Sequence, residues 1–352
     1  MRVAAEVLEA FAARLLAAAG VPAAAAAGCA AVLVEADLED NGSHGLLRLP
    51  IYLAAIARGQ IDPAATPRVE TTGPATAVVD GANTLGPVVA RAAMDEAIRL
   101  ARAAGVGMVT ARHSNHYGPA SYYAAQAAAA GMIGLTTTNS PPAMPPWGGR
   151  APYLGTNPIA CAFPGSGAPL VVDLSLSVVA RGKIIQAARQ GQPIPPGWAV
   201  DAAGRETTDP RAVLAGGAVL PLGGAKGFAL ALAVEVLSGL LAGAAFGPHV
   251  TSILADDVAP ANVGHWFLAA DVARFLPPAA FGAALDQLRA ELKAAEAADP
   301  RAPVRLPGER RAAARAEQRA HGVALPPETL RALDDWAARL GQPPLAADQM
   351  EA

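Results

Sequence analysis

The chain has 352 residues, with 27 basic and 30 acidic side chains and a formal net charge of −3 at pH 7. This length is enough to bury a complete core and to form two or three domains. The near balance of charge argues against a general attraction to nucleic acid or anionic lipid, and neither is an expected partner.

Cysteine content and apolar patterning bear on the compartment. Cys29 and Cys161 are too few and too far apart for a disulfide framework, which favours a reduced, cytoplasmic setting. Acidic residues interrupt the first apolar segment, so no signal peptide is expected. The longest apolar run, residues 227–247, contains Glu235 and several glycines, and it predicts a buried helix rather than a membrane span.

Residues 1–72 are predicted to form a helical N-terminal part. Apolar residues recur at helical spacing in its first two segments. The second helix is expected to end at Asn41-Gly42, because both residue types accept a left-handed conformation. A third helix is expected over residues 46–58, where Pro50 either kinks the helix or marks its true start.

From residue 73 to 271, short β-branched runs alternate with helical stretches, which predicts a central α/β part. The expected strands are residues 75–79, 106–111, 132–138, 169–173 and 265–270. The expected helices between them are residues 119–130, 177–190 and 226–245. Residues 272–352 are predicted to return to helix, at 279–297, 309–320 and 327–340, and to pack with the N-terminal part.

Two short glycine-bounded segments hold three of the six histidines. In the first segment, His44 follows Ser43 and lies close to Arg48 and Tyr52. On one continuous helix, positions 44, 48 and 52 would share a face that offers a titratable imidazole, a guanidinium for a carboxylate and a phenol. The alternative is that Ser43 only caps a helix and that His44 is a solvated residue of its first turn.

The second segment, His113 to Gly118, follows a predicted strand. Ligands gather at the carboxyl ends of strands in α/β sheets, and Gly118 and Pro119 would place free backbone N–H groups beside His116 for an anion. One alternative is that His113 and His116 only satisfy turn carbonyls. Another is a metal pair, but no acidic or cysteine ligand stands at a suitable spacing, so no metal is expected.

Asp173 and Lys226 are further candidates. Asp173 ends a predicted strand, where a carboxylate can orient an imidazole, and its alternative role is to cap the next helix. Lys226 follows a glycine-rich stretch, but a complete phosphate-binding loop is absent and the residue could be an ordinary flanking lysine. The dinucleotide fingerprint and the hydrolase nucleophile elbow are also absent from the sequence. The residues alone therefore predict an α/β enzyme with histidine acid–base chemistry on a small anion.

Taken together, the motifs resemble those of the malate/L-lactate dehydrogenase family that lacks the Rossmann fold. This family also contains sulfolactate and ureidoglycolate dehydrogenases and Δ1-piperideine-2-carboxylate reductases. The matching stretches are Gly42–Gly45, Arg48–Pro50, Tyr52, Ser114–Gly118, Gly131–Gly134, Asn139, Gly148–Gly149, Leu154–Pro158, Asp173–Ser175, Gly197–Ala199, Asp201, Gly204, Thr207–Pro210, Pro221–Gly224, Lys226–Gly227 and Pro307–Glu309. The resemblance implies an α/β fold with a mixed sheet, which would explain the missing glycine fingerprint.

The resemblance further implies a homodimeric oxidoreductase that uses NAD or NADP to interconvert a small 2-hydroxy acid and a 2-keto acid. It makes residues 73–271 the cofactor-binding and catalytic part. It marks Ser43, His44, His116 and Asp173 as catalytic candidates, and Arg48 and Tyr52 as substrate-binding candidates. The residues expected to contact the cofactor are His116, Gly118, Pro119, Ala120, Asn139, Ser140, Asp173, Leu174, Ser175, Lys226, Arg305, Pro307 and Gly308.

Other functions stay open from the sequence. The chain could be an NADPH-dependent reductase of a cyclic or N-alkyl 2-imino acid, because such a substrate presents the same carboxylate beside an sp² carbon. A histidine-based metal-dependent hydrolase or lyase and a catalytically inactive binding protein are the alternatives from other classes. NADP would need a basic group near its 2′-phosphate, for which Arg150, Arg181 and Arg305 are candidates.

Overall fold

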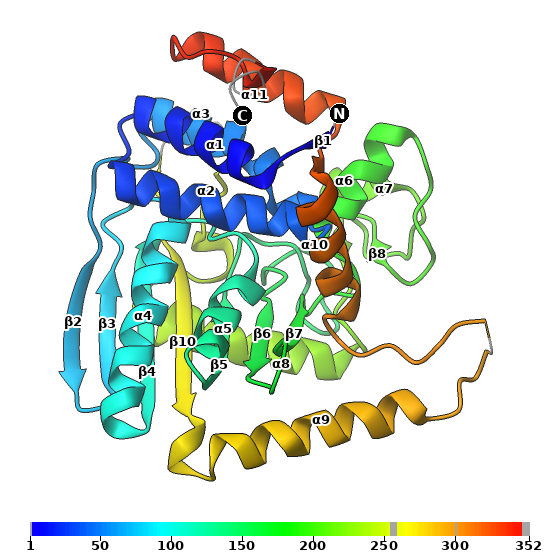
Figure 1. The fold of residues 1–352 in the computed structure, drawn as a ribbon. Coiled ribbons are helices and arrows are strands. Elements are labelled where there is room, and N and C mark those ends of the chain that lie inside the picture. The colour runs from blue at the N-terminus through cyan, green and yellow to red at the C-terminus, as the bar shows by residue number, and fades with distance from the viewer. Residues whose placement is uncertain (1, 254–258, 300, 347–352) are drawn as a thin grey trace.

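The computed structural model describes residues 2–253, 259–299 and 301–346, and it confirms the predicted α/β class with a mixed sheet (Figure 1). In the central seven-stranded sheet, one neighbouring pair of strands, β3 and β4, is parallel and the other pairs are antiparallel. From edge to edge the strands are β2 (Arg68–Gly73), β3 (Thr76–Asp80), β4 (Val106–Ser114), β10 (Val263–Asp271), β5 (Met132–Thr138), β6 (Ile159–Phe163) and β7 (Leu170–Leu174).

The five predicted strands correspond to β3, β4, β5, β7 and β10, whereas β2 and β6 were not predicted. β2 is an exposed edge strand of mostly polar residues, so it lacks the apolar alternation that identifies a half-buried strand. β6 contains two alanines and a cysteine among its five residues, which weakens the β-branched signal.

Helices cover both faces of the sheet (Figure 1). The first face carries α4 and α5, and the second carries α8 and a π-helical turn that continues it. Their bounds are α4 (Gly86–Ala104), α5 (Ala120–Ala129), α8 (Ala225–Glu235) and the turn Val236–Leu240. The α-helix predicted over residues 226–245 therefore ends at Glu235. One side of it is exposed rather than buried, since Leu230 keeps 45% of its surface in solvent.

Glycines in the strands let these helices approach the sheet closely. A Cβ at Gly134 of β5 would lie 2.4 Å from the carbonyl oxygen of Ala124 in α5. On the other face, a Cβ at Gly264 of β10 would lie 1.8 Å from the carbonyl oxygen of Ser238. Both distances are well inside van der Waals contact, so the spacing of the layers depends on these two residues having no side chain.

A layer of helices from both ends of the chain lies beside the sheet (Figure 1). It consists of α1 (Ala5–Ala18), α2 (Ala23–Leu38), α3 (Leu49–Ala57) and α11 (Pro327–Arg339). One hydrophobic core joins Leu8 and Phe11 to Leu333 and Ala337, and β1 (Arg2–Val3) pairs with β11 (Val323–Ala324). The early and late segments of the chain therefore fold together.

The remaining elements extend from this body (Figure 1). A small lobe with its own apolar core contains α6 (Arg181–Gln190), α7 (Pro210–Leu214), β8 (Ala199–Val200) and β9 (Ala218–Val219). Two further helices lie between β10 and β11 in the chain. The first, α9 (Pro278–Ala294), runs along the end of the sheet away from α1, and the second, α10 (Glu309–His321), contacts α2. In the described part of the chain, no helix is long and apolar enough to cross a membrane.

The segment between α2 and α3 differs from the prediction. Asp40, with a φ of 56°, adopts the left-handed conformation expected for Asn41 and Gly42. Short 3₁₀ turns follow at Gly42–His44 and Leu46–Arg48, and α3 then begins at Leu49 with Pro50 in its first turn. Pro50 therefore marks the true start of the helix, which is where its missing N–H costs nothing.

Replacing Gly134 with alanine should destabilise the protein by about 1–3 kcal/mol, because the new methyl group meets the α5 backbone and cannot be accommodated by a side-chain rotation. Urea unfolding followed by circular dichroism measures this change. Gly167→Ala is the matched control, since a Cβ there meets no atom within 4 Å. Equal stability of the two variants would contradict the close packing of α5 on β5.

Candidate active site

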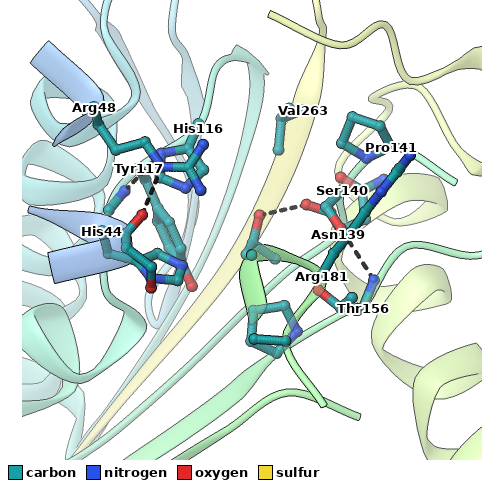
Figure 2. Close-up of a pocket in the computed structure, with 16 residues that line it drawn as sticks. His44, Arg48, His116, Tyr117, Asn139, Ser140, Pro141, Thr156, Arg181 and Val263 are labelled. Atoms are coloured by element: carbon teal, nitrogen blue, oxygen red, sulfur yellow. Dashed lines mark hydrogen bonds between the residues drawn. The ribbon is translucent and has the colours of Figure 1, made fainter. Parts of the chain in front are cut away.

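A cleft of about 780 Å³, counting the space at its open mouth, brings both histidine segments together (Figure 2). His44, Arg48, His116 and Tyr117 lie on one side of the cleft, and Asn139, Ser140 and Arg181 lie on the other. The two sides come from the α2–α3 segment with the end of β4, and from the end of β5 with the start of α6.

A buried carboxylate shapes the α2–α3 segment. Asp37, at the end of α2, accepts a hydrogen bond from the backbone N–H of Leu46 at 2.7 Å. Gly45 must be glycine at this point, because a Cβ would lie 2.1 Å from a carboxylate oxygen of Asp37. Burial raises the pKa of Asp37 to about 7, and the hydrogen bond from Leu46 opposes the rise. The 3₁₀ turns around Asp37 thus replace the single helical face expected for positions 44, 48 and 52.

The rings of His44 and His116 are stacked, with centroids 5.5 Å apart and planes inclined by 25°. Ser43 Oγ lies 2.9 Å from His44 Nδ1, and no side chain caps α3, so the capping alternative for Ser43 is wrong. The Tyr52 hydroxyl lies 2.6 Å from His116 Nδ1. The backbone N–H of Gly118, expected to be free for an anion, donates to the same nitrogen at 3.3 Å.

Both histidines are held in the uncharged form. Burial lowers the pKa of His44 to about 4, Arg48 lowers it further, and Asp173 acts in the opposite direction. Burial, followed by the charges of Arg48 and His44, holds the pKa of His116 well below its usual value. Two neutral imidazoles therefore line the cleft at neutral pH, and a neutral imidazole can accept a proton.

Arg48 is a partly buried cation without a carboxylate partner among the residues that the structure describes. Its Nε donates to the carbonyl oxygen of Ser43 at 2.7 Å, and its two terminal nitrogens make no described hydrogen bond. Burial lowers the pKa of Arg48, but a guanidinium stays charged at neutral pH. The cleft therefore combines an uncompensated positive charge with two neutral proton acceptors.

Asp173 lies outside the cleft lining and bonds to a different group from the one expected. Arg311 of α10 donates to its carboxylate at 2.7 Å and to Ser121 Oγ at 2.9 Å. No described histidine hydrogen-bonds to Asp173. The capping alternative is also wrong, because α6 begins at Arg181 after Ala180. Arg311 was not predicted, and an arginine among several others on an exposed helix gives no sequence signal.

The metal-pair alternative lacks a suitable geometry. The ring of His113 lies 3.0 Å from both carboxylate oxygens of Asp80 on the exposed side of β4, while His116 faces Tyr52. Within residues 2–253, 259–299 and 301–346, no three His, Cys, Asp or Glu side chains gather as a metal ion would require.

His265 is a supporting residue that the sequence did not distinguish from ordinary core histidines. It is fully buried on β10, and its ring stacks on Tyr117 at 4.5 Å. Its two nitrogens lie 2.7 Å from Thr138 Oγ1 and 2.8 Å from Ser114 Oγ. Burial lowers the pKa of His265 to about 3, so a neutral ring braces two residues of the cleft, Tyr117 and Thr138.

The expected cofactor residues fall into two groups. Those that line the cleft are His116, Gly118, Asn139 and Ser140. Those outside its lining are Pro119, Ala120, Asp173, Leu174, Ser175, Lys226, Arg305, Pro307 and Gly308. The amide of Asn139 is already used, since it donates to Ala245 and accepts from Gly264.

Two segments of the second group, around residues 173 and 308, are brought together by the fold. A Cβ at Gly308 would lie 3.0 Å from the carbonyl oxygen of Val171, so this turn rests on β7 close to Asp173. Of the three candidate arginines for a 2′-phosphate, Arg181 lines the cleft and the other two do not.

The cleft also has an apolar lining that the sequence did not predict. The residues Pro141, Pro158, Gly182 and Val263 contribute to it, and Thr156 donates its backbone N–H to Ser140 Oγ at 3.1 Å. The proline-rich loop after Asn139 was the available signal for Pro141. A flat heteroaromatic ring such as nicotinamide fits an apolar slot of this kind, and the residues present are compatible with it.

Known proteins resemble the whole chain. The malate/L-lactate dehydrogenase family model matches residues 3–334. An L-sulfolactate dehydrogenase from Methanocaldococcus jannaschii is 43% identical over 280 residues, which cover 80% of each chain. A (2R)-3-sulfolactate dehydrogenase (NADP(+)) from Chromohalobacter salexigens is 41% identical over 94% of this chain and 96% of its own.

A solved structure supports the same relationship. The malate dehydrogenase from Entamoeba histolytica superimposes with a TM-score of 0.93 at 28% identity, and the match covers 97% of this chain and 99% of that one. The sequence matches, the mixed sheet and the paired histidine segments agree with one another. The chain is a member of the malate/L-lactate dehydrogenase family.

Proposed function

We propose that this protein uses NAD or NADP to interconvert a small 2-hydroxy acid and the corresponding 2-keto acid. The observation that carries the proposal is that Arg48, which has no carboxylate partner among the described residues, lines the same cleft as the stacked, neutral His44 and His116. A 2-hydroxy acid places a carboxylate next to the carbon that is oxidised. The cation and the imidazoles therefore match the two parts of such a substrate.

Arg48 is proposed to bind the substrate carboxylate. A guanidinium offers two parallel N–H donors to a carboxylate, and such a pair is stronger and better oriented than a neutral hydrogen bond. The terminal nitrogens of Arg48 are available for this contact because Nε alone is used by the protein, to hold Ser43. The charge also repels a proton from both imidazoles, so the same residue binds substrate and keeps the base neutral.

His116 is proposed as the principal acid and base, with the Ser43–His44 pair stacked against it. The substrate hydroxyl must lose its proton during oxidation, and the keto oxygen must gain one during reduction. When bound, the nicotinamide takes up or returns the hydride. Asp173 is proposed to act at a distance, because its carboxylate favours the charged form of His44 without touching the ring.

The cleft-lining residues His116, Gly118, Asn139 and Ser140 are proposed to surround the nicotinamide end of the cofactor. The candidates outside the lining are proposed to hold the rest of it: Pro119, Ala120, Asp173, Leu174, Ser175, Lys226, Arg305, Pro307 and Gly308. Among them, Lys226 is exposed at the start of α8 and makes no described ion pair, which suits a phosphate contact. The metal-dependent hydrolase or lyase has no support in the family or in the described side chains.

A homodimer in the cytoplasm is proposed as the setting of this activity. Leu230, Leu232, Val236, Leu240 and Leu241 each expose more than 40% of their surface along α8 and its π-helical turn. An exposed apolar patch of this kind is typical of a protein interface, and a second copy of the chain is the proposed occupant. Neither Cys29 nor Cys161 forms a disulfide, in keeping with a reducing compartment.

The function is tested by the loss of nicotinamide absorbance when NADH or NADPH is supplied with a panel of acids. The panel contains pyruvate, oxaloacetate, 2-oxoglutarate, sulfopyruvate and Δ1-piperideine-2-carboxylate. We expect turnover of a 2-keto acid with at least one cofactor. Turnover of the imino acid alone would replace the proposal by an imine reductase, and the absence of binding of either cofactor in a fluorescence titration would reject it.

Replacing His116 with alanine should lower kcat by about 10² or more with the cofactor saturating, because the proton acceptor is removed. His113→Asn is the matched control, since it changes a nearby histidine at the end of β4 that is exposed and contacts Asp80. Asparagine also tolerates the left-handed backbone at this position, where φ is 49°. Retention of the wild-type kcat by His116→Ala would exclude His116 as the acid or base.

The acid limb of kcat/KM for oxidation should lie below the ordinary histidine value of 6.5. A lowered pKa keeps the base unprotonated as the pH falls, so activity should be retained to lower pH and be lost only near the depressed value, about 4 for His44. The measurement is a pH profile of the free enzyme. Asp37→Asn removes a carboxyl whose pKa is raised to about 7 and so separates its titration from that of the histidines. A limb centred at or above 6.5 in both proteins would contradict the neutral-histidine assignment.

A further inference from the structure

The Tyr52 hydroxyl lies against His116 and not in the cleft. Tyr52 is 1% exposed and is absent from the cleft lining, although the family resemblance predicts a substrate contact for it. Its oxygen lies 2.6 Å from Nδ1 of His116 and 3.2 Å from the carbonyl oxygen of the same residue. The Tyr52 hydroxyl therefore lies within hydrogen-bond distance of two groups. One is the ring nitrogen of His116, which can gain or lose a proton, and the other is the carbonyl oxygen of His116, which can only accept a hydrogen bond.

The backbone of Gly118 fixes the direction of these hydrogen bonds in the resting protein. A backbone N–H can only donate, and that of Gly118 points at His116 Nδ1. Nδ1 must then carry a lone pair, Tyr52 donates its hydrogen to it, and the ring hydrogen sits on Nε2. Nε2 has no hydrogen-bond partner among the described residues, and the ring lines the cleft, so this nitrogen is the one available to substrate.

We propose that Tyr52 is a positioning residue that holds the His116 ring and gives Nδ1 a hydrogen-bond partner throughout proton transfer at Nε2. The identity of the proton donor, the substrate hydroxyl, rests on the proposed function. The contact between Tyr52 and His116 does not. It replaces a substrate-binding role for Tyr52 by one that acts through His116.

The hydroxyl can reverse its role without ionising. Oxidation needs the other tautomer, in which Nε2 is bare and the ring hydrogen sits on Nδ1. The resting ring reaches it by exchange with solvent water: Nε2 releases its hydrogen to a water molecule at the open cleft, and Nδ1 takes up a hydrogen that comes from water. In that tautomer Nδ1 donates to the Tyr52 oxygen, and the phenol hydrogen turns to the carbonyl oxygen of His116. The hydrogen bond from the backbone N–H of Gly118 to Nδ1, the longer of the two contacts at 3.3 Å, is given up. Nε2 then gains the proton of the substrate hydroxyl, and the carbon that carries this hydroxyl becomes the keto carbon, so that the ring becomes an imidazolium. A bound nicotinamide would supply the acceptor for the hydride of that carbon. The same contacts run in reverse during reduction.

A neutral phenol suits this position better than a carboxylate. Burial raises the pKa of the Tyr52 hydroxyl, so Tyr52 stays uncharged. The groups that face His116 are Arg48, His44 and His265, and none of them is an anion. A carboxylate on Nδ1 would favour the imidazolium and remove the base at neutral pH, whereas a phenol orients the ring without this effect.

The contact is tested without catalysis by ¹⁵N–¹H correlation spectra of the histidine rings in the free protein. We expect the neutral His116 ring to carry its hydrogen on Nε2. In Tyr52→Phe we expect the Nδ1 resonance to shift, because one accepted hydrogen bond is lost. A hydrogen on Nδ1 in the resting wild-type protein, or an unchanged Nδ1 resonance in Tyr52→Phe, would overturn the proposal.

Kinetics distinguish positioning from substrate binding. Tyr52→Phe keeps the buried ring, so we expect kcat to fall about tenfold, which is the effect of one buried hydrogen bond, while the substrate KM stays unchanged. Tyr122→Phe is the control, because its hydroxyl makes no described hydrogen bond and lies outside the cleft. A raised KM with unchanged kcat in Tyr52→Phe would restore the substrate role. If the wild-type protein turns over no acid, the proposed function fails, and the ring spectra still decide the role of Tyr52.

Discussion

The site depends on one buried carboxylate. Asp37 lies in the last turn of α2, and the backbone after this helix folds back onto its carboxylate. Leu46 donates its backbone N–H to this carboxylate, and Gly45 packs closely against it. This fold-back sets the positions of three functional groups at once: the His44 ring, the Arg48 guanidinium and the start of α3, which carries Tyr52. A regular helix through the same residues would direct these side chains along one line. The two 3₁₀ turns instead direct His44 and Arg48 into the cleft and leave Tyr52 behind His116.

The second half of the site comes from the edge of the sheet where β4 and β5 end and the antiparallel β10 begins. β4 delivers His116, β5 delivers Asn139 and Ser140, and β10 braces the region with His265. The electrostatics then follow from burial and from Arg48. Burial and a nearby cation both disfavour protonation of an imidazole. His44 and His116 therefore stay neutral and able to accept a proton. A bound anionic substrate would offset the charge of Arg48. Binding of the substrate carboxylate would therefore raise the affinity of the two imidazoles for a proton.

Much of this could be predicted from sequence, for specific physical reasons. β-branched residues identified β3 and β5, because such residues favour a half-buried pleated surface. Glycine-bounded histidines identified the two segments that meet at the cleft. The prediction failed where a role depends on a distant partner. Nothing near Asp173 indicates Arg311, which lies 138 residues further along the chain, and nothing near Tyr52 indicates the ring of His116. The α4 helix was the avoidable omission, since Pro87 in its first turn and Gly105 after its end are ordinary helix signals.

Because β1 pairs with β11, the two ends of the chain must both be synthesised before the fold around the cleft is complete. The helices that carry His44 share their apolar core with Leu333 and Ala337, and Arg311 secures Asp173 from the same late part of the chain. During synthesis, the strands of the sheet and both histidine segments emerge from the ribosome well before these residues do. The nascent chain can therefore assemble its central layers early, but the layer around His44 is completed only after residues 311–337 have emerged. Loss of this late segment would thus inactivate the enzyme from a distance, without altering a single residue of the cleft.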